Sequence, residues 1–156
     1  MKKSKTKKII LIIAVIVVLA AIYPVYLFFM PHRDVQQTEA FATLSSKELV
    51  SEYLKDNAAA NAKYLEKDGN SKVLIIEGVI ASISEDQNNQ TVILLKDADE
   101  EAGVNCTFLT EATNHIKNLK VGDKIKVKGF ITLGASYDDD LEMYEDVIMQ
   151  DCDIFE

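Results

Sequence analysis

KVLIIEGVIASIS, residues 72–84, is the stretch of sequence that decides the fold. Branched apolar residues fill it, and its hydrophobic period of two replaces the helical period of the preceding residues. Gly78 lies in its middle, and interior strand glycines usually mark a bulge or bend that lets a sheet curve. A second stretch, KIKVKGFITL at 124–133, repeats this arrangement around Gly129. The two stretches together predict a strongly curved sheet.

Three more strands are expected around these two, at 90–97, 103–109 and 142–155. Between the third and fourth strands, residues 110–119 predict a short helix capped by Thr110. This order of elements is that of the OB-fold, a small five-stranded Greek-key barrel. The predicted fold class is therefore mainly β, with an OB-fold barrel over residues 72–156. An open sandwich of the same strands is an alternative, but it would leave strand edges uncovered.

A helical segment precedes the predicted barrel. Ser45 and Glu48 have the spacing of a capping box, in which side chain and backbone satisfy each other reciprocally. Apolar residues then recur at steps of three and four as far as Leu65. We expect one amphipathic helix over residues 44–67, which must bury its apolar stripe and could serve as a spacer or as a plug for the barrel.

The N-terminus has the composition of a membrane anchor. Residues 9–30 are 22 residues without a charge, interrupted only by Pro24. As a helix they would span about 33 Å, enough to cross a bilayer. The five lysines of residues 1–8 predict a cytoplasmic tail by the positive-inside tendency. With a linker at 31–43, the sequence predicts a single-pass signal anchor and an extracytoplasmic C-terminal domain.

A cleaved secretory signal is the competing interpretation of the same segment, because it also begins basic and continues apolar. The small-x-small motif at 40–42 lies well past the apolar core, and bulky aromatic residues stand where small ones are needed. We therefore favour an uncleaved anchor. Both interpretations export the C-terminal domain.

Charge divides the chain sharply. Residues 34–156 contain 11 lysines and all 25 acidic residues, a formal net charge of −14. A field of this sign repels phosphate backbones, whose binding depends on cationic contacts and counterion release. This balance argues against nucleic acid as the partner.

Lys124, Lys126 and Lys128 alternate with aliphatic residues and so share one face of the fourth strand. They could form a binding face for a polyanion, or they could be the solvated side of a half-buried strand. Single-strand binding would need exposed aromatic platforms on the second and third strands. The second strand has no aromatic residue, and the period of the third directs Phe108 inward. The solvated face is the favoured interpretation.

Cys106 and Cys152 are the only cysteines, and both occupy predicted inward positions. In an OB barrel the third and fifth strands are neighbours, so a disulfide between them is one expectation and a pair of reduced core thiols is the other. Two acid-rich segments, 97–101 and 138–146, match no calcium loop and are interpreted as solvated. No metal, cofactor or catalytic constellation is expected, since His115 is the only histidine of the exported domain.

The motifs NAAANAKY (57–64), VLIIEGVIASI, VNCTF, LKVGDKIKVKG and EDVIMQDCDI resemble the tRNA_anti-like family, OB-fold proteins common in Bacteroidetes. The resemblance covers about residues 48–155. It implies a fold similar to anticodon-binding domains and implies no established activity.

The function predicted from the sequence is therefore a membrane-anchored, extracytoplasmic OB-fold binding or adaptor protein that is not an enzyme. Its partner would be a protein or an envelope polymer, bound through one sheet face and the loops 85–90, 97–103 and 134–141. The alternative is a single-stranded DNA or RNA binding protein, which is the common use of the fold.

Overall fold

A computed structural model describes residues 22–23, 34–66 and 71–155. The chain divides into two compact units, Met1–Arg33 and Asp34–Glu156. Ile22 and Tyr23, the described residues of the first unit, are helical. Apart from these two, the predicted basic tail and transmembrane helix (1–8 and 9–30) lie outside the described residues. Within the described ranges, no helix is long and apolar enough to cross a membrane.

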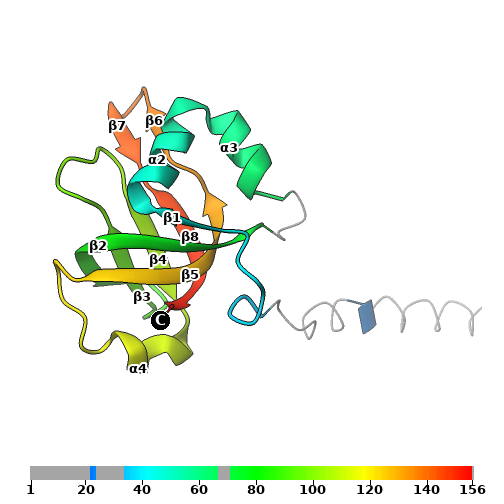
Figure 1. Ribbon diagram of the computed structural model, residues 1–156, viewed down its shortest axis with the longest axis vertical. Helices are drawn as coiled ribbons and strands as arrows, with labels where there is room; N and C mark the ends of the chain where they lie inside the picture. Colours follow the sequence, from blue (N-terminus) through cyan, green and yellow to red (C-terminus); the bar gives the residue numbers. More distant parts are fainter. Residues whose placement is uncertain (1–21, 24–33, 67–70, 156) are drawn as a thin grey trace, which may run out of the picture. The chain divides into compact units, whose positions relative to one another are not determined.

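Five strands close into a barrel in the second unit (Figure 1). They are β2 (Val73–Glu85), β3 (Thr91–Leu95), β4 (Val104–Phe108), β5 (Lys124–Leu133) and β8 (Val147–Ile154). Neighbours follow the order β2–β3–β4–β8–β5, and β5 returns to β2. The β4–β8 pair is parallel and the others are antiparallel. The prediction of a mainly β, OB-fold barrel is confirmed, and the open sandwich is wrong.

The connection between β4 and β5 contains less helix than the predicted segment 110–119. It holds a 3₁₀ turn, η1 (Thr110–Ala112), and one helical turn, α4 (Thr113–Ile116). Ala112 and Ile116 are buried against the core, so the segment covers the lower end of the barrel in Figure 1.

β2 is long enough to belong to both sides of the barrel. Its first half, from Val73 to Val79, pairs with β5, and its second half, from Ile80 to Glu85, pairs with β3. The register shifts between Ile80 and Ser82, which bends the strand. The β5–β8 register shifts around Gly129, where a side chain has no room because a Cβ would lie 2.7 Å from Cys152 Sγ.

Two helices, not one, precede the barrel strands. A short strand, β1 (Ala42–Ser45), runs parallel to β2 across the end of the expected linker and the start of the expected helix, and α2 (Ser46–Lys55) and α3 (Asn57–Tyr64) follow it. The capping box is confirmed, with Glu48 N–H donating to Ser45 Oγ at 3.2 Å and Ser45 N–H to Glu48 Oε2 at 2.9 Å. The helix expected over 44–67 is interrupted at Asp56, whose carboxylate accepts from Ala59 N–H at 2.9 Å and caps α3.

α2 covers the end of the barrel opposite α4 (Figure 1). Its buried side chains Leu49, Val50 and Tyr53 join the core formed by the inward residues of the barrel strands. The inward residues of the five barrel strands are Leu74, Ile76, Ile80, Ile93, Leu95, Val104, Cys106, Phe108, Val127, Ile131, Val147, Met149 and Cys152. The helix therefore acts as a plug, which is the second of the two roles expected for it.

The strand expected over 142–155 is also divided. β7 (Met143–Glu145) pairs with β6 (Ser136–Asp138) as a separate two-stranded sheet, and β8 begins after Asp146. The Asp146 carboxylate ends β7 because it turns toward β4, accepting from Gly103 N–H at 2.7 Å and from Asn105 Nδ2 at 2.9 Å. The resulting hairpin lies at the upper end of the barrel, beside α2 (Figure 1).

Candidate binding surface

The outer surface of β3, β4 and β8 contains a patch without charged side chains, which we call the neutral face. The inward residues of β3 and β4 alternate with half-buried outward ones. Val92 lies opposite Thr107, and Leu94 lies opposite Asn105, which in turn is opposite Ile148. These five residues define the neutral face. It corresponds to the strand 2–3 surface through which OB barrels commonly bind their ligands.

The β6–β7 hairpin at the upper end of the barrel (Figure 1), residues 136–145, is a further exposed element, which we call the tyrosine hairpin. Tyr137 and Tyr144 are directly opposite each other, with ring centroids 4.8 Å apart and an interplanar angle of 60°. Tyr144 also contacts the acidic loop before β4, where the Glu101 carboxylate raises the pKa of its phenol. The two acid-rich segments identified in the sequence therefore meet at one end of the barrel.

Helix α2 and its neighbour α3 fix the start of the tyrosine hairpin. The Tyr53 ring lies against Gly134, where a Cβ would overlap the ring. Asn57 Nδ2 donates to Ala135 O at 2.9 Å. Asp146 fixes the other end of the hairpin to β4, as described above. Both ends of this loop are therefore held by the body of the domain.

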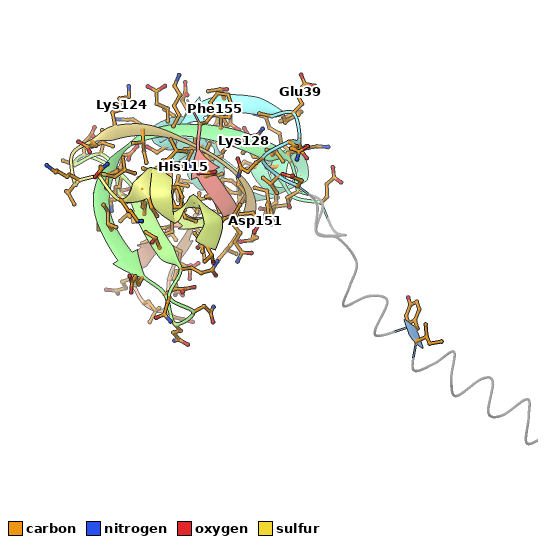
Figure 2. The ribbon with its side chains drawn as sticks, turned by 90° about the horizontal axis from the view of Figure 1, so that it is seen from below. Glu39, His115, Lys124, Lys128, Asp151 and Phe155 are labelled. Atoms are coloured by element: carbon orange, nitrogen blue, oxygen red, sulfur yellow. The ribbon has the colours of Figure 1, made fainter. Side chains whose placement is uncertain are left out.

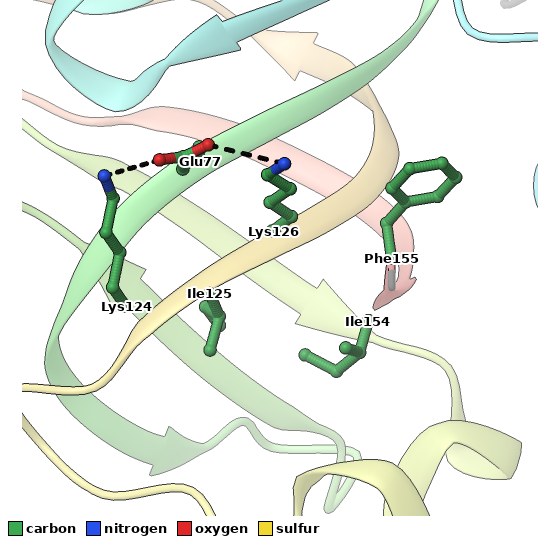
Figure 3. A pocket seen from close by; sticks show the side chains of 6 residues that line it. All are labelled: Glu77, Lys124, Ile125, Lys126, Ile154 and Phe155. Carbon is green, nitrogen blue, oxygen red and sulfur yellow. Dashed lines mark ion pairs between the residues drawn. The ribbon is translucent and has the colours of Figure 1, made fainter.

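A second surface, which we call the lysine groove, lies along the start of β5. Glu77, Lys124, Ile125, Lys126, Ile154 and Phe155 line a pocket of about 380 Å³ (Figure 3). Glu77 of β2 lies between Lys124 and Lys126 and forms an ion pair with each. The Lys124 ammonium lowers the pKa of Glu77, and Glu77 raises the pKa of Lys124. The Glu77 carboxylate is therefore the ion-pair partner of both exposed lysines.

Lys128 differs from the sequence prediction, because its side chain does not share the solvated face. The residue is only 8% exposed, and its ammonium donates to Gln36 O at 2.7 Å. Gln36 in turn donates through Nε2 to Asp151 O at 2.7 Å and to Lys128 O at 3.2 Å. The turn that contains Gln36 thus covers β5 and β8.

A further pocket of about 500 Å³ adjoins the lysine groove through Ile154 and Phe155. Figure 2 shows Lys128, His115 and Phe155 on the side of the barrel seen from below. His115 Nδ1 lies 2.9 Å from Asp153 Oδ1, so this ring is also oriented by a carboxylate. Phe155 is 40% exposed and lies beside the lysines. The sequence indicated no exposed aromatic ring near these lysines, and Phe155 is such a ring.

Cys106 and Cys152 are both fully buried in the barrel interior, on neighbouring strands as predicted. Burial raises the pKa of the Cys152 thiol well above its usual value, and the adjacent Cys106 thiol raises it further. The structure contains them as free thiols whose side chains contact each other, and the disulfide, one of the two expectations from the sequence, stays a prediction. A buried thiol with a raised pKa is a poor nucleophile at neutral pH.

Among the described residues, no group of three or more histidine, cysteine or acidic side chains could hold a metal ion. Many of the acidic side chains instead accept hydrogen bonds within their own loops. Asp86, for example, accepts from Asn88 N–H at 2.8 Å and from Gln90 N–H at 2.9 Å.

The sequence indicated the loop 134–141 as a contact, but not its pairing with residues 143–145 into the tyrosine hairpin, and it indicated neither Phe155 nor the turn at Gln36. The hairpin had a signal, since Tyr137 and Tyr144 flank the polar stretch DDDLEM, which is a turn between two aromatic positions. The turn at Gln36 had none. Its partners Lys128 and Asp151 are 92 and 115 residues away in the sequence.

The chain is similar to one protein family by sequence and to solved structures by fold. The sequence profile of the tRNA_anti-like family matches residues 1–141. No curated protein matches the sequence significantly. A lipoprotein from Klebsiella pneumoniae subsp. pneumoniae MGH 78578, proposed to bind nucleic acid, is similar with a TM-score of 0.54 and 16% identity. That match covers 81% of this chain and 100% of the lipoprotein chain, and at this identity it shows the fold alone.

Two further structures resemble smaller parts of the chain. The Stn1–Ten1 complex of S. pombe has a TM-score of 0.36 and 18% identity, with 54% of this chain and 58% of that chain covered. The asparaginyl-tRNA synthetase of Entamoeba histolytica, in complex with asparaginyl-adenylate, has a TM-score of 0.38 and 16% identity, with 61% and 22% covered.

Proposed function

The chain belongs to the tRNA_anti-like family, and from this membership and the barrel geometry we propose that it is a non-catalytic OB-fold binding or adaptor protein. In this proposal residues 9–30 anchor it in a membrane, and the barrel is extracytoplasmic. The partner is a protein or an envelope polymer that contacts the neutral face and the tyrosine hairpin.

The observation that supports this proposal best is the absence of charge on the neutral face. A barrel that binds nucleic acid there needs cationic side chains and aromatic platforms on β3 and β4. The outward residues of these strands are instead Val92, Leu94, Asn105 and Thr107. The acidic excess of residues 34–156 adds a repulsive field around this face.

The positions of the two cysteine thiols and of the His115 imidazole support a non-catalytic role. Both thiols lie in the barrel interior, away from any substrate. The imidazole of His115 faces the Asp153 carboxylate on an exposed surface, and this pair lines its pocket with Gln36 and Lys128. A general base needs a substrate proton or nucleophile within reach, and this pocket offers no hydroxyl or thiol side chain.

Nucleic-acid binding remains the alternative because of one observation. Lys124, Lys126 and the exposed ring of Phe155 line the same groove. Cations beside an aromatic ring can hold a phosphate and stack a base. Against this alternative, Glu77 already pairs with both lysines, and a bound phosphate would have to displace it.

The first experiment measures binding of the full-length protein to fluorescent single-stranded DNA and RNA at about 50 mM and about 200 mM salt. We expect no measurable binding at either salt concentration. Binding that weakens steeply with salt, is lost in Lys124→Ala/Lys126→Ala and persists in Lys47→Ala/Lys63→Ala would establish the alternative. The control variant removes the same charge from two exposed lysines elsewhere.

The second experiment tests the location of the barrel. A protease added to intact cells should degrade the C-terminal domain, and a reporter fused after residue 156 should be active only outside the cytoplasm. Protection of the domain in intact cells, with degradation after lysis, would contradict the proposed topology.

A further inference from the structure

We propose that the tyrosine hairpin is the docking element for a lysine- or arginine-rich segment of a partner protein. This inference rests on the proposed binding function and names the chemistry of the partner. It follows from three features of residues 136–145: exposed apolar side chains, carboxylates without partners, and a backbone held at both ends.

The hairpin exposes an unusual amount of apolar surface for so small an element. Tyr137 is 47% exposed, Leu141 66% and Met143 52%. Tyrosine supplies large contact area at a low cost in conformational entropy and is enriched where proteins bind one another. Exposed apolar side chains gathered on one projecting loop therefore indicate an interaction surface.

The charge around these side chains is of one sign. From residue 129 to residue 156 the sequence contains nine acidic residues and no lysine, arginine or histidine. Glu145 accepts from Ser136 Oγ at 2.6 Å, and Asp138 accepts from two backbone N–H groups of the turn. The carboxylates of Asp139, Asp140 and Glu142 make no such contact within the part of the chain that the structure describes. They are free to pair with an incoming cation.

The combination of aromatic rings and free carboxylates selects the ligand chemistry. A guanidinium or ammonium group is attracted to the face of a tyrosine ring, and it forms charge-assisted hydrogen bonds with carboxylates. Arginine can do both at once because its planar group stacks through its face and donates N–H bonds from its edge. Nucleic acid, anionic polymers and a second copy of this acidic domain would each be repelled.

Both ends of the hairpin are held by the body of the domain, which favours docking. Tyr53 and Asn57 hold its first end through Gly134 and Ala135, and Asp146 holds its second end. A loop that is already ordered loses less conformational entropy when it binds. The exposed residues are therefore presented by a fixed support on the side of the domain where α2 plugs the barrel.

The test uses the full-length protein and fluorescein-labelled peptides of about 12 residues. The probe alternates arginine with serine, and the two comparison peptides carry lysine or glutamate in place of arginine. Binding is measured by fluorescence anisotropy. We expect the arginine peptide to bind, the lysine peptide to bind more weakly and the glutamate peptide not to bind.

Two pairs of variants locate the site. Asp139→Asn/Glu142→Gln should weaken binding of the arginine peptide about fivefold, since each exposed charge pair contributes modestly. The matched control, Glu39→Gln/Glu85→Gln, removes the same charge from exposed positions away from the hairpin and should change binding less than twofold. Tyr137→Ala should weaken binding about threefold, whereas Tyr137→Phe should preserve it because the ring face remains.

The outcomes separate this inference from the proposed function. Equal weakening in the hairpin variant and its control would mean that the whole acidic domain attracts cations without a docking site, and it would overturn the inference. Absence of peptide binding would do the same and leave the binding function standing. Tight binding of single-stranded nucleic acid in the first experiment of the preceding section would overturn both.

Discussion

Gly134 lies beneath the ring of Tyr53, at the point where β5 leads into the tyrosine hairpin. A methyl group at this position would overlap the ring, so α2 or the hairpin would have to move. Overpacking of this kind usually costs about 1–3 kcal/mol. We expect Gly134→Ala to lower the free energy of unfolding by about that amount, measured by urea denaturation.

A double-mutant cycle checks the cause of that loss. In a Tyr53→Ala background the ring is absent, so the added methyl group meets open space and should cost much less than in the parent protein. An equal cost in both backgrounds would show that Gly134 is needed for its backbone conformation and not for the space it leaves.

Tyr53 itself has a buried hydroxyl that finds no hydrogen-bond partner among the described residues. Burial raises the pKa of its phenol from 10.0 to about 12. Between these two values the unfolded chain releases the proton and the folded protein keeps it, so stability should fall as pH rises from 10 to 12. Tyr53→Phe should reduce this fall and, near neutral pH, raise the free energy of unfolding by about 1 kcal/mol, measured by denaturation at each pH.

Tyr64 provides the matched control, because its hydroxyl donates to Glu52 Oε2 at 2.8 Å. Tyr64→Phe removes a made hydrogen bond and should destabilise by about 1 kcal/mol. Opposite signs for the two Tyr→Phe changes would support the assignment of the unpartnered hydroxyl, and a loss at both positions would contradict it.

The turn at Gln36 joins the segment before β1 to the barrel. The Gln36 amide donates to the backbone carbonyls of Lys128 and Asp151, where the β5–β8 ladder is irregular. Gln36→Ala leaves both carbonyls without this donor, and we expect a loss of about 1–2 kcal/mol in the free energy of unfolding. Thermal or urea denaturation measures it.

Gln37 is the control for this prediction. Its side chain donates to the exposed Asp34 carboxylate at 2.7 Å and does not reach the barrel. Gln37→Ala should therefore change stability by less than about 0.5 kcal/mol. A similar loss at both positions would mean that the turn contributes through its own conformation and not through its contact with β5 and β8.

The elements that the sequence predicted correctly are those determined by local pattern. The capping box at Ser45 depends on a spacing of three residues, and the barrel strands depend on a period of two. The missed boundary within the last strand depends on partners elsewhere in the chain. Asp146 divides the last predicted strand because its carboxylate binds Gly103 and Asn105, more than 40 residues earlier.

In the candidate site, too, local pattern predicted the direction of side chains but not their distant partners. Alternation placed Lys124, Lys126 and Lys128 on one side of β5 correctly, since side-chain direction follows from the period of a strand. That Glu77 pairs with two of them depends on the β2–β5 register, and that Lys128 is covered depends on Gln36. Neither contact leaves a signal in the local sequence.

The excess of carboxylates over lysines determines the electrostatics of the domain. Residues 34–156 hold 25 acidic residues and 11 lysines. In the described part of the chain, ion pairs engage Lys47, Lys63, Lys72, Lys124 and Lys126, and all are partly exposed. Exposed pairs of this kind contribute little each, whereas the unpaired carboxylates repel one another across the surface. Repulsion should therefore outweigh attraction in the folded domain.

This balance predicts that sodium chloride stabilises the protein. Raising the salt concentration from about 10 mM to about 150 mM shortens the Debye length from about 30 Å to about 8 Å, which screens repulsion between distant carboxylates. We expect the free energy of unfolding to rise by on the order of 1 kcal/mol, measured by urea denaturation at each salt concentration. Asp139→Asn/Glu142→Gln removes two of the repelling charges, so this variant should be more stable at low salt and less sensitive to salt. A stability that falls as salt is added would instead mean that the ion pairs dominate, and the excess negative charge would then be too dispersed to direct a cationic partner to the hairpin.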